Sequence, residues 1–243
     1  MPTYNLLSFD SPDALARAAA TAWVDDIAQA RSAGKHYSVA LSGGRFVQTF
    51  FALTVELARA RSVSFDHVHF FWADERCVPP ESPDSNFKIA RDSLFAPLNI
   101  PATNIHRLRG ELDPEVAARQ AITELAQIVP PGASGLPAFD LVQLGMGEDG
   151  HIASLFPNAS PEIINCSASY LAVYDSPKPP PRRLSLSYAA IATARQVSVL
   201  VSGASKAEAL AESLLPTGKT PLARLLQNKP RLTIFCHLPK INT

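Results

Sequence analysis

Hydrophobic and polar positions divide this chain into short apolar runs and longer amphipathic segments. The apolar runs are rich in β-branched and aromatic residues and predict strands at residues 37–41, 67–73, 139–144, 170–175, 183–188, 196–203 and 231–237. Segments with apolar residues at helical spacing, or with many alanines, predict helices at residues 12–31, 46–60, 86–95 and 204–215. The two kinds of segment alternate along much of the chain.

Two helix starts have recognisable capping sequences. Ser11 followed by Pro12 is typical of an N-cap with proline at the first helical position, and Asp113 followed by Pro114 repeats the pattern. Both pairs therefore predict the first residue of a helix.

Alternation of strands with helices is typical of an α/β fold. We expect a mainly parallel, Rossmann-like sheet with helices on both faces, formed by residues 1–243 as a single domain. In such sheets ligands bind at the carboxyl ends of the strands. The four polar clusters SGG, ADER, GMGEDGH and SGASK each follow a predicted strand, so we expect them to surround one site. Residues 74–84 are expected to form a loop, and the proline-rich residues 176–183 a stiff surface loop.

Composition narrows the classes of partner. The 243 residues contain 22 basic and 22 acidic side chains, so no net field attracts nucleic acid or an anionic membrane surface. No apolar stretch approaches the roughly 18 residues needed to cross a bilayer, and the first residues lack the basic-then-apolar order of a secretion signal. We expect a cytoplasmic monomer that binds neither nucleic acid nor membranes.

Cysteine usage argues against a disulfide framework. Cys77, Cys166 and Cys236 are odd in number, far apart and outside any C-x-x-C spacing. We therefore expect three free, partly buried thiols and no zinc site.

Several of the polar clusters could bind a phosphate. The SGG sequence, Ser42 to Gly44, lies between a strand and a helix, where glycines let the backbone approach a ligand and the first helical N–H groups face outward. A plain turn with a helix cap remains the alternative. Lys206 lies just after a strand, at the start of a helix, where its ammonium group could meet a phosphate, and an isolated exposed lysine is the alternative. Arg76, Arg182 and Arg183 add cations that could equally be solvated.

GMGEDGH also carries a proton-transfer pair. His151 titrates near neutral pH, and Asp149, two residues earlier, could fix its tautomer. Turn and capping hydrogen bonds are the alternative use of these side chains. Asp74, in ADER, is a second carboxylate at a strand end. Taken together, the clusters predict a site for proton transfer on a small phosphorylated molecule.

Two other kinds of site are weaker alternatives. Gly145, Gly147 and Gly150 formally match G-x-G-x-x-G, which would indicate a dinucleotide, with Asp175 near the position of a ribose-binding acid. However, Glu148 and Asp149 would place negative charge in the pyrophosphate cradle. His67 and His69 alternate on a strand without a further ligand at metal-binding spacing, so we expect structural roles for them.

Longer stretches resemble a known family. FFWADERCVPPESPDSNFKIA and LVQLGMGEDGHIASLFPNA closely resemble the 6-phosphogluconolactonase family, whose patterns include W-x-D-E-R-x-V, S-N and G-x-G-x-D-G-H-x-A-S-L-F-P. ALSGG, KPPPRRLSLSYAAI and VLVSGASKAEAL resemble its other blocks in the same order. The related glucosamine-6-phosphate deaminases carry an F-N-E-P segment after the histidine, whereas this chain has SLFPN and no acid before Glu162.

Two positions depart from the family's pattern. Where the family commonly has S-G-G-S/T-x-P, this chain has Arg45 and no proline, so a hydroxyl contact to phosphate would be replaced by a charge-assisted donor. Ile152 replaces the more usual threonine after the histidine, and we expect this change to be tolerated.

The resemblance implies hydrolysis of 6-phospho-D-glucono-1,5-lactone without metal or cofactor, as part of the oxidative pentose phosphate pathway. By position it implies that His151 is the catalytic base and that Asp149 and Asp74 lie near the sugar and the histidine. The implied substrate-binding residues are Ser42, Gly43, Gly44, Arg45, Arg76, Arg183 and Lys206.

Overall fold

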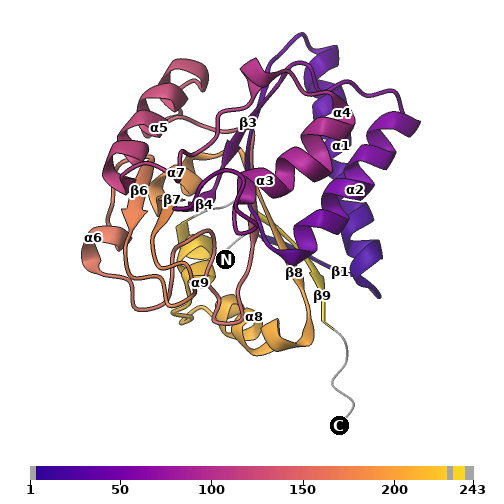
Figure 1. The fold of residues 1–243 in the computed structure, drawn as a ribbon. Coiled ribbons are helices and arrows are strands. Elements are labelled where there is room, and N and C mark those ends of the chain that lie inside the picture. The colour runs from indigo at the N-terminus through magenta and orange to yellow at the C-terminus, as the bar shows by residue number, and fades with distance from the viewer. Residues whose placement is uncertain (1–3, 229–231, 239–243) are drawn as a thin grey trace.

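A six-stranded parallel sheet forms the centre of the molecule (Figure 1). The computed structural model describes residues 4–228 and 232–238. Its strands lie in the order β1-β9-β8-β5-β2-β3, and every neighbouring pair is parallel. Their bounds are Tyr4–Ser8 for β1, Tyr37–Leu41 for β2, Val68–Trp72 for β3, Leu141–Gly145 for β5, Gln196–Ser202 for β8 and Leu232–His237 for β9. The predicted α/β class with a mainly parallel sheet is confirmed.

Helices cover both faces of this sheet, with α1 and α2 side by side on one face (Figure 1). The helices are α1 (Pro12–Ser32), α2 (Arg45–Ala60), α3 (Asn86–Ala90), α4 (Ala96–Leu98), α5 (Pro114–Ile128), α6 (Pro161–Ile164), α7 (Tyr188–Thr193), α8 (Ala207–Leu214) and α9 (Pro221–Asn228). Both predicted caps are confirmed, because the side chain of Ser11 accepts from Ala14 N–H and that of Asp113 accepts from the N–H groups of Glu115 and Val116.

The strand order places a switch point between β2 and β5. From β2 the chain continues outward to β3, whereas from β5 it continues through β8 and β9 toward the other edge. Loops that leave neighbouring strands in opposite directions open a crevice at their carboxyl ends, which is where ligands bind in such sheets. The loop after β2 begins with Ser42, and the loop after β5 contains His151.

A second, three-stranded sheet forms one wall beside this crevice. It consists of β4 (Asp74–Arg76), β7 (Arg183–Leu186) and β6 (Tyr170–Val173), paired antiparallel in that order. The structure corrects two expectations here. Residues 74–76 are a short strand rather than part of a loop, and the strands predicted at 170–175 and 183–188 belong to this sheet instead of the large one.

The remaining differences concern the ends of elements and several elements without a strong pattern. The helix predicted at 86–95 is divided into α3, a π-helical turn at Arg91–Phe95, and α4, while residues 204–206 form a 3₁₀ turn before α8. The sequence did not predict β1, α6, α7 or α9, and Tyr188, expected at the end of a strand, begins α7. The strand expected at 231–237 begins at Leu232 among the described residues, and residue 231 lies outside them.

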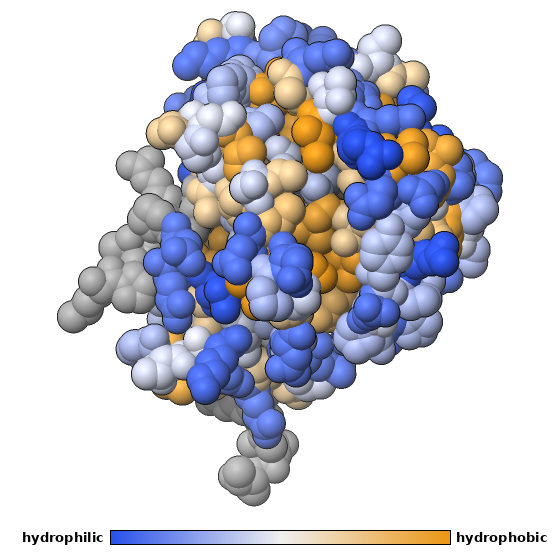
Figure 2. Space-filling model, turned by 90° about the vertical axis from the view of Figure 1, so that its left-hand side faces the viewer, coloured by the Kyte–Doolittle hydropathy of each residue, from blue (hydrophilic) through white to orange (hydrophobic). Residues whose placement is uncertain are grey.

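Large apolar side chains fill the space between the sheet and α1 and α2. Trp23 of α1 is 2 % exposed and stacks on Phe50 of α2, with ring centroids 5.5 Å apart. Figure 2 shows the side of the molecule on which α5, α6 and β6 lie, where hydrophilic side chains surround hydrophobic ones in the middle. Among the described residues, no helix is long and apolar enough to cross a membrane.

Candidate active site

The four polar clusters meet at one cleft of about 310 Å³ at the carboxyl ends of the strands. The cleft is within the range of small-molecule sites, roughly 300–1,000 Å³. Nine residues singled out in the sequence line it: Ser42, Gly43, Gly44, Arg45, Asp74, Arg76, His151, Arg183 and Lys206. The tenth, Asp149, contacts His151 from outside the cleft wall.

His151 lies against the cleft with its ring oriented by Asp149. Nδ1 of His151 is 2.5 Å from Oδ1 of Asp149, and the ring packs on Phe156 with centroids 4.7 Å apart. A carboxylate only accepts hydrogen bonds, so Nδ1 carries the proton and Nε2 keeps its lone pair. Nε2 has no hydrogen-bond partner among the described residues. The side chain is 18 % exposed and can reach a molecule in the cleft.

The surroundings of His151 favour its neutral form. Burial lowers the pKa of His151 below the ordinary value of 6.5, although the hydrogen bond and charge of Asp149 act in the opposite direction. The positive charge of Lys178 adds to the lowering, and Asp74 opposes it. At neutral pH the imidazole is therefore available to accept a proton.

The glycine-rich loop provides the room that this pair requires. A Cβ at Gly147 would come within 2.0 Å of His151 Nδ1 and 2.7 Å of Asp149 Oδ1. The loop is closed by a hydrogen bond from Gly147 N–H to His151 O, at 2.9 Å, and another from Gly150 N–H to Gly147 O, at 3.1 Å. Gly150 has a φ of +77°, a conformation that favours glycine.

Asp74 lies at the start of β4 and is connected to the same loop. Its Oδ2 accepts a hydrogen bond from the hydroxyl of Ser154, at 2.8 Å, and Ser154 N–H donates to the hydroxyl of Ser185 on β7. The carboxylate is 7 % exposed and lines the cleft. The small sheet thus positions a second carboxylate on the side of the cleft near His151.

The start of α2 also lines the cleft. Its N-cap, Gly44, has a φ of +105° and supplies no side-chain hydrogen bond to this 16-residue helix, where Val47 N–H donates to Gly44 O, at 3.2 Å. A helix start without a side-chain cap can bind an anion through its first N–H groups. The hydroxyl of Ser42 donates to Gln143 O, at 2.8 Å, and joins the loops after β2 and β5. Its proton is therefore committed to the protein rather than to a ligand.

Cations outnumber carboxylates along the cleft although the whole chain has no net charge. The side chain of Lys206 has no hydrogen bond or ion pair with the described residues, and burial lowers its pKa. Nη1 of Arg76 donates to Asp84 O, at 2.6 Å, while its buried Nε has no partner in the described part of the chain. Cationic groups without bound carboxylates favour an anionic ligand. The cations of the cleft are Arg45, Arg76, Lys178, Arg183 and Lys206.

Arg183 has a more structural position than the sequence indicated. It is 5 % exposed, and its Nε and Nη2 donate to the carbonyl groups of Lys178, Pro179 and Pro180. Most of the guanidinium therefore holds the proline-rich loop. Lys178, on that loop, was missed as a cleft residue because residues 176–183 were interpreted as surface, although KPPPRR had carried part of the resemblance.

Two further residues, Glu75 of the ADER cluster and Asn86, were not among the predicted site residues, yet they hold the backbone around Arg76 and Gly43 in place. Glu75 is 2 % exposed and accepts hydrogen bonds from the N–H groups of Arg76, Asn86 and Phe87 and from the Ser85 hydroxyl. Burial raises the pKa of Glu75. Asn86 donates to Asp74 O, at 2.9 Å, and lies so close to Gly43 that a Cβ there would come within 1.8 Å of its Oδ1. The S-N pattern was the available signal.

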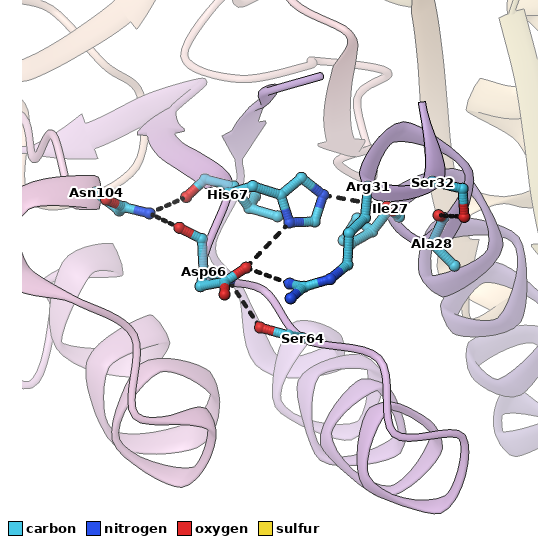
Figure 3. A network of polar contacts seen from close by, with 9 residues as sticks. Ile27, Ala28, Arg31, Ser32, Ser64, Asp66, His67 and Asn104 are labelled. Carbon is cyan, nitrogen blue, oxygen red and sulfur yellow. Dashed lines mark hydrogen bonds and ion pairs between the residues drawn. The ribbon is translucent and has the colours of Figure 1, made fainter. Parts of the chain in front are cut away.

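The alternative sites lack the geometry they would need. After Gly150 the chain forms turns, and the next helix along the chain, α6, begins only at Pro161, so the GMGEDG loop does not lead directly into a helix as the dinucleotide motif requires. His67 contacts Asp66 and the carbonyl oxygen of Ile27, beside the ion pair of Arg31 with Asp66 (Figure 3).

His69 lies 3.0 Å from His106, whose other ring nitrogen is 2.7 Å from Glu124. Within residues 4–228 and 232–238, no three His, Cys, Asp or Glu side chains are grouped to hold a metal. Cys77, Cys166 and Cys236 are free thiols, as expected.

Comparisons with known proteins agree with this geometry. The family model described as glucosamine-6-phosphate isomerases/6-phosphogluconolactonase matches residues 10–234. A 6-phosphogluconolactonase of Mycobacterium tuberculosis is 38% identical over 213 residues, which cover 85% of this chain and 84% of the relative. A probable chloroplastic 6-phosphogluconolactonase of Oryza sativa is 34% identical over 248 residues, 98% of this chain and 75% of the relative. The solved structure of the 6-phosphogluconolactonase of Trypanosoma brucei superposes with a TM-score of 0.80 at 29% identity, covering 98% of this chain and 96% of that one.

Proposed function

We infer that this chain, which belongs to the family of glucosamine-6-phosphate isomerases and 6-phosphogluconolactonases, hydrolyses 6-phospho-D-glucono-1,5-lactone to 6-phosphogluconate. This reaction is the second step of the oxidative pentose phosphate pathway. The observation that carries the proposal is the neutral, oriented imidazole of His151 in the same cleft as several cations without bound carboxylates.

In the proposed mechanism His151 acts as a general base. Nε2 takes a proton from a water molecule while the water oxygen forms a bond to C1 of the lactone, and the C1 carbonyl electrons move onto its oxygen. When the tetrahedral intermediate collapses, the bond between C1 and the ring oxygen breaks and the imidazolium returns the proton to that oxygen. Asp149 stabilises the imidazolium through Nδ1, at 2.5 Å.

The phosphate of the substrate is held at the other end of the cleft in this proposal. The N–H groups at the start of α2, together with Arg76 and Lys206, supply donors and positive charge for a dianion. Arg45 occupies the position where the family commonly has a hydroxyl residue and adds a further charged donor. Holding the phosphate fixes C1 beside His151, which lowers the entropic part of the barrier.

A lactone is an activated ester, and the scheme needs neither a metal ion nor a cofactor. A deaminase of the glucosamine-6-phosphate type is the nearest alternative, and the segment after His151 argues against it. SLFPN contains no acid, and the next carboxylate, Glu162, lies in the first turn of α6 and does not line the cleft. This chain therefore has no carboxylate at the position of the glutamate that distinguishes the deaminases.

The test is proton release from freshly generated 6-phosphogluconolactone, corrected for spontaneous hydrolysis in a parallel sample without enzyme. We expect acid release proportional to the amount of protein added. Ammonia release from glucosamine 6-phosphate, measured with the same preparation, should stay at background. Ammonia release without lactone consumption would support the deaminase, and an increase in thermal stability with NADP(H) in place of turnover would support a nucleotide-binding module.

The cellular setting is also a proposal. Three free cysteines fit a reducing compartment, and we expect the enzyme in the cytoplasm. We expect it to act as a monomer without a nucleic-acid or membrane partner. Light scattering on the purified protein tests the monomer, and fractionation of the source cells tests the location.

A further inference from the structure

Lys178 lines the cleft, yet the mechanism proposed above gives it no role. It lies on the loop between β6 and β7 and is exposed, and the GMGEDGH loop lines the same cleft. Its ammonium group has no hydrogen bond or ion pair with the described residues. An exposed lysine can simply be solvated. The contacts around Lys178 therefore decide whether the protein holds this residue in place.

Two neighbouring side chains fix the backbone of Lys178. The hydroxyl of Ser176 donates to Lys178 O, at 2.8 Å, and accepts from Lys178 N–H, at 3.2 Å. Nη2 of Arg183 donates to Lys178 O, at 3.1 Å, and the same guanidinium holds the next two carbonyl groups. Burying a guanidinium is costly, and within the described part of the chain the hydrogen bonds of Arg183 all hold the segment that carries Lys178.

Lys178 lines the same cleft as His151, and its charge acts on the groups at the reacting end. Burial is the main cause of the lowered pKa of His151, and Lys178 is the cation of the cleft that lowers it further. Burial raises the pKa of Asp149, but its hydrogen bond with His151 and the charges of His151 and Lys178 outweigh this effect. Burial chiefly lowers the pKa of Lys206, and the charges of Lys178 and Arg45 add to this lowering, whereas Arg45 is not among the groups that act on His151 or Asp149. Lys178 thus acts on both members of the catalytic pair.

Resting on the hydrolysis proposed above, we propose that Lys178 is a further catalytic residue whose ammonium group donates a hydrogen bond to the carbonyl oxygen of the lactone. As water adds to C1, the carbonyl electrons move onto that oxygen, and the charge of Lys178 stabilises it. The electrons return to re-form the carbonyl when the ring oxygen leaves. Lys178 keeps all its protons throughout, and the proton of water passes only through His151.

The experiment compares Lys178→Met with Lys35→Met, an exposed lysine beside the amino end of β2. A donor to the oxyanion acts mainly in the transition state, so we expect kcat of Lys178→Met to fall roughly 10- to 100-fold while KM changes less than about threefold. Lys178→Arg should recover part of the lost turnover because it keeps the charge. Lys35→Met should match the wild type.

A second readout separates this role from a structural one. His151 faces Asp149 on its own loop, Asp74 on β4 and Lys178, so removing the Lys178 charge should raise the pKa of His151. The acid limb of kcat/KM, and the His151 titration measured by NMR, should therefore move to higher pH. Loss of loop structure alone would not reproduce this shift together with rescue by arginine.

Other outcomes overturn the inference. A higher KM with unchanged kcat would assign Lys178 to phosphate binding, and wild-type values for kcat and the acid limb would leave it without a catalytic role. If the wild-type protein consumes no lactone, the proposed function itself fails, and that result is seen before any variant is made. If Lys178→Met unfolds, Lys178→Gln and the NMR titration of Lys178→Arg decide the question.

Discussion

At the scale of single residues, the proposed chemistry depends on the charge state and orientation of one imidazole. Asp149 fixes the Nδ1 proton of His151, while burial keeps the ring neutral. The spacing of two residues between them predicted this pair from the sequence. What the spacing could not show is the space around the pair, which depends on Gly147 having no side chain.

Gly147→Ala should therefore damage catalysis without removing a catalytic group. Its methyl group would lie about 2 Å from His151 Nδ1 and must displace the ring. A displacement of about 1 Å can cost roughly 100-fold in rate, and we expect a loss of that order in kcat. Steady-state kinetics measure the loss, and the His151 NMR titration reports whether the Asp149 hydrogen bond persists.

Gly145→Ala is the matched control for the same loop. A Cβ at Gly145 meets no atom within 4 Å, so the His151 titration should keep its wild-type midpoint. If Gly147→Ala also retained that midpoint and full turnover, the position of His151 beside Asp149 would not depend on the missing side chain at Gly147.

The roles of individual cations were the part of the site that the sequence predicted least well. Arg183 was assigned to the substrate, but its guanidinium mainly binds backbone carbonyl groups of the loop it follows. Lys178 was not singled out, because a proline-rich segment with several charges is typical of a surface loop. The path of the backbone between β6 and β7 determines which cation of this loop faces the cleft. That path cannot be predicted from the composition of the loop.

At the scale of elements, β4 and α3 support the part of the cleft that we propose binds the phosphate. The buried carboxylate of Glu75 binds three backbone N–H groups and one hydroxyl, and it thereby joins β4 to the start of α3. Asn86 then fills the space over Gly43. These contacts position Arg76 and the turn before α2.

Glu75→Gln should destabilise the protein because an amide cannot accept from all four donors. Leaving buried donors without partners costs about 1–3 kcal/mol, and we expect the free energy of unfolding to fall by an amount in this range. Urea denaturation followed by circular dichroism measures it. Glu81→Gln, at an exposed carboxylate nearby, is the control and should leave the midpoint unchanged; equal midpoints for both variants would contradict the role of Glu75.

The sequence predicted elements well where a pattern was long and missed them where it was short. Helix α1 has both a capping sequence and 21 residues, whereas α9 has only eight, and β4 has three polar residues whose strand pairing comes from β7. The edge strand β1 is exposed along most of its length and lacks the buried apolar run of a central strand. These elements form because they pack or pair with segments that are distant in the sequence.

At the scale of the whole molecule, topology collects the active loops. Neighbouring strands β2 and β5 continue in opposite directions, so their loops open one crevice, and the small sheet adds Asp74 and Arg76. The rule that ligands bind at the carboxyl ends of parallel strands predicted from the sequence that these loops lie together. The local excess of cations, in a chain with 22 basic and 22 acidic residues, could not be read from the net charge.

The proposed division of the cleft predicts separate kinetic effects at its two ends. Arg76→Ala or Lys206→Ala removes a charged donor from the phosphate end, where each such hydrogen bond contributes about 1.5–3 kcal/mol, so KM should rise about tenfold or more. kcat should change less. Arg182→Ala, an exposed neighbour outside the cleft, is the control. Unaltered KM in both variants would argue against the phosphate site.

The most direct measurement is turnover of 6-phosphogluconolactone by His151→Ala, beside His36→Ala as an exposed-histidine control. General-base catalysis contributes about 10²–10⁴ in rate, so kcat of His151→Ala should fall at least about 100-fold, with KM and thermal stability close to those of the wild type. His36→Ala should keep full turnover. Near wild-type turnover by a folded His151→Ala protein would contradict the assignment of His151 as the base.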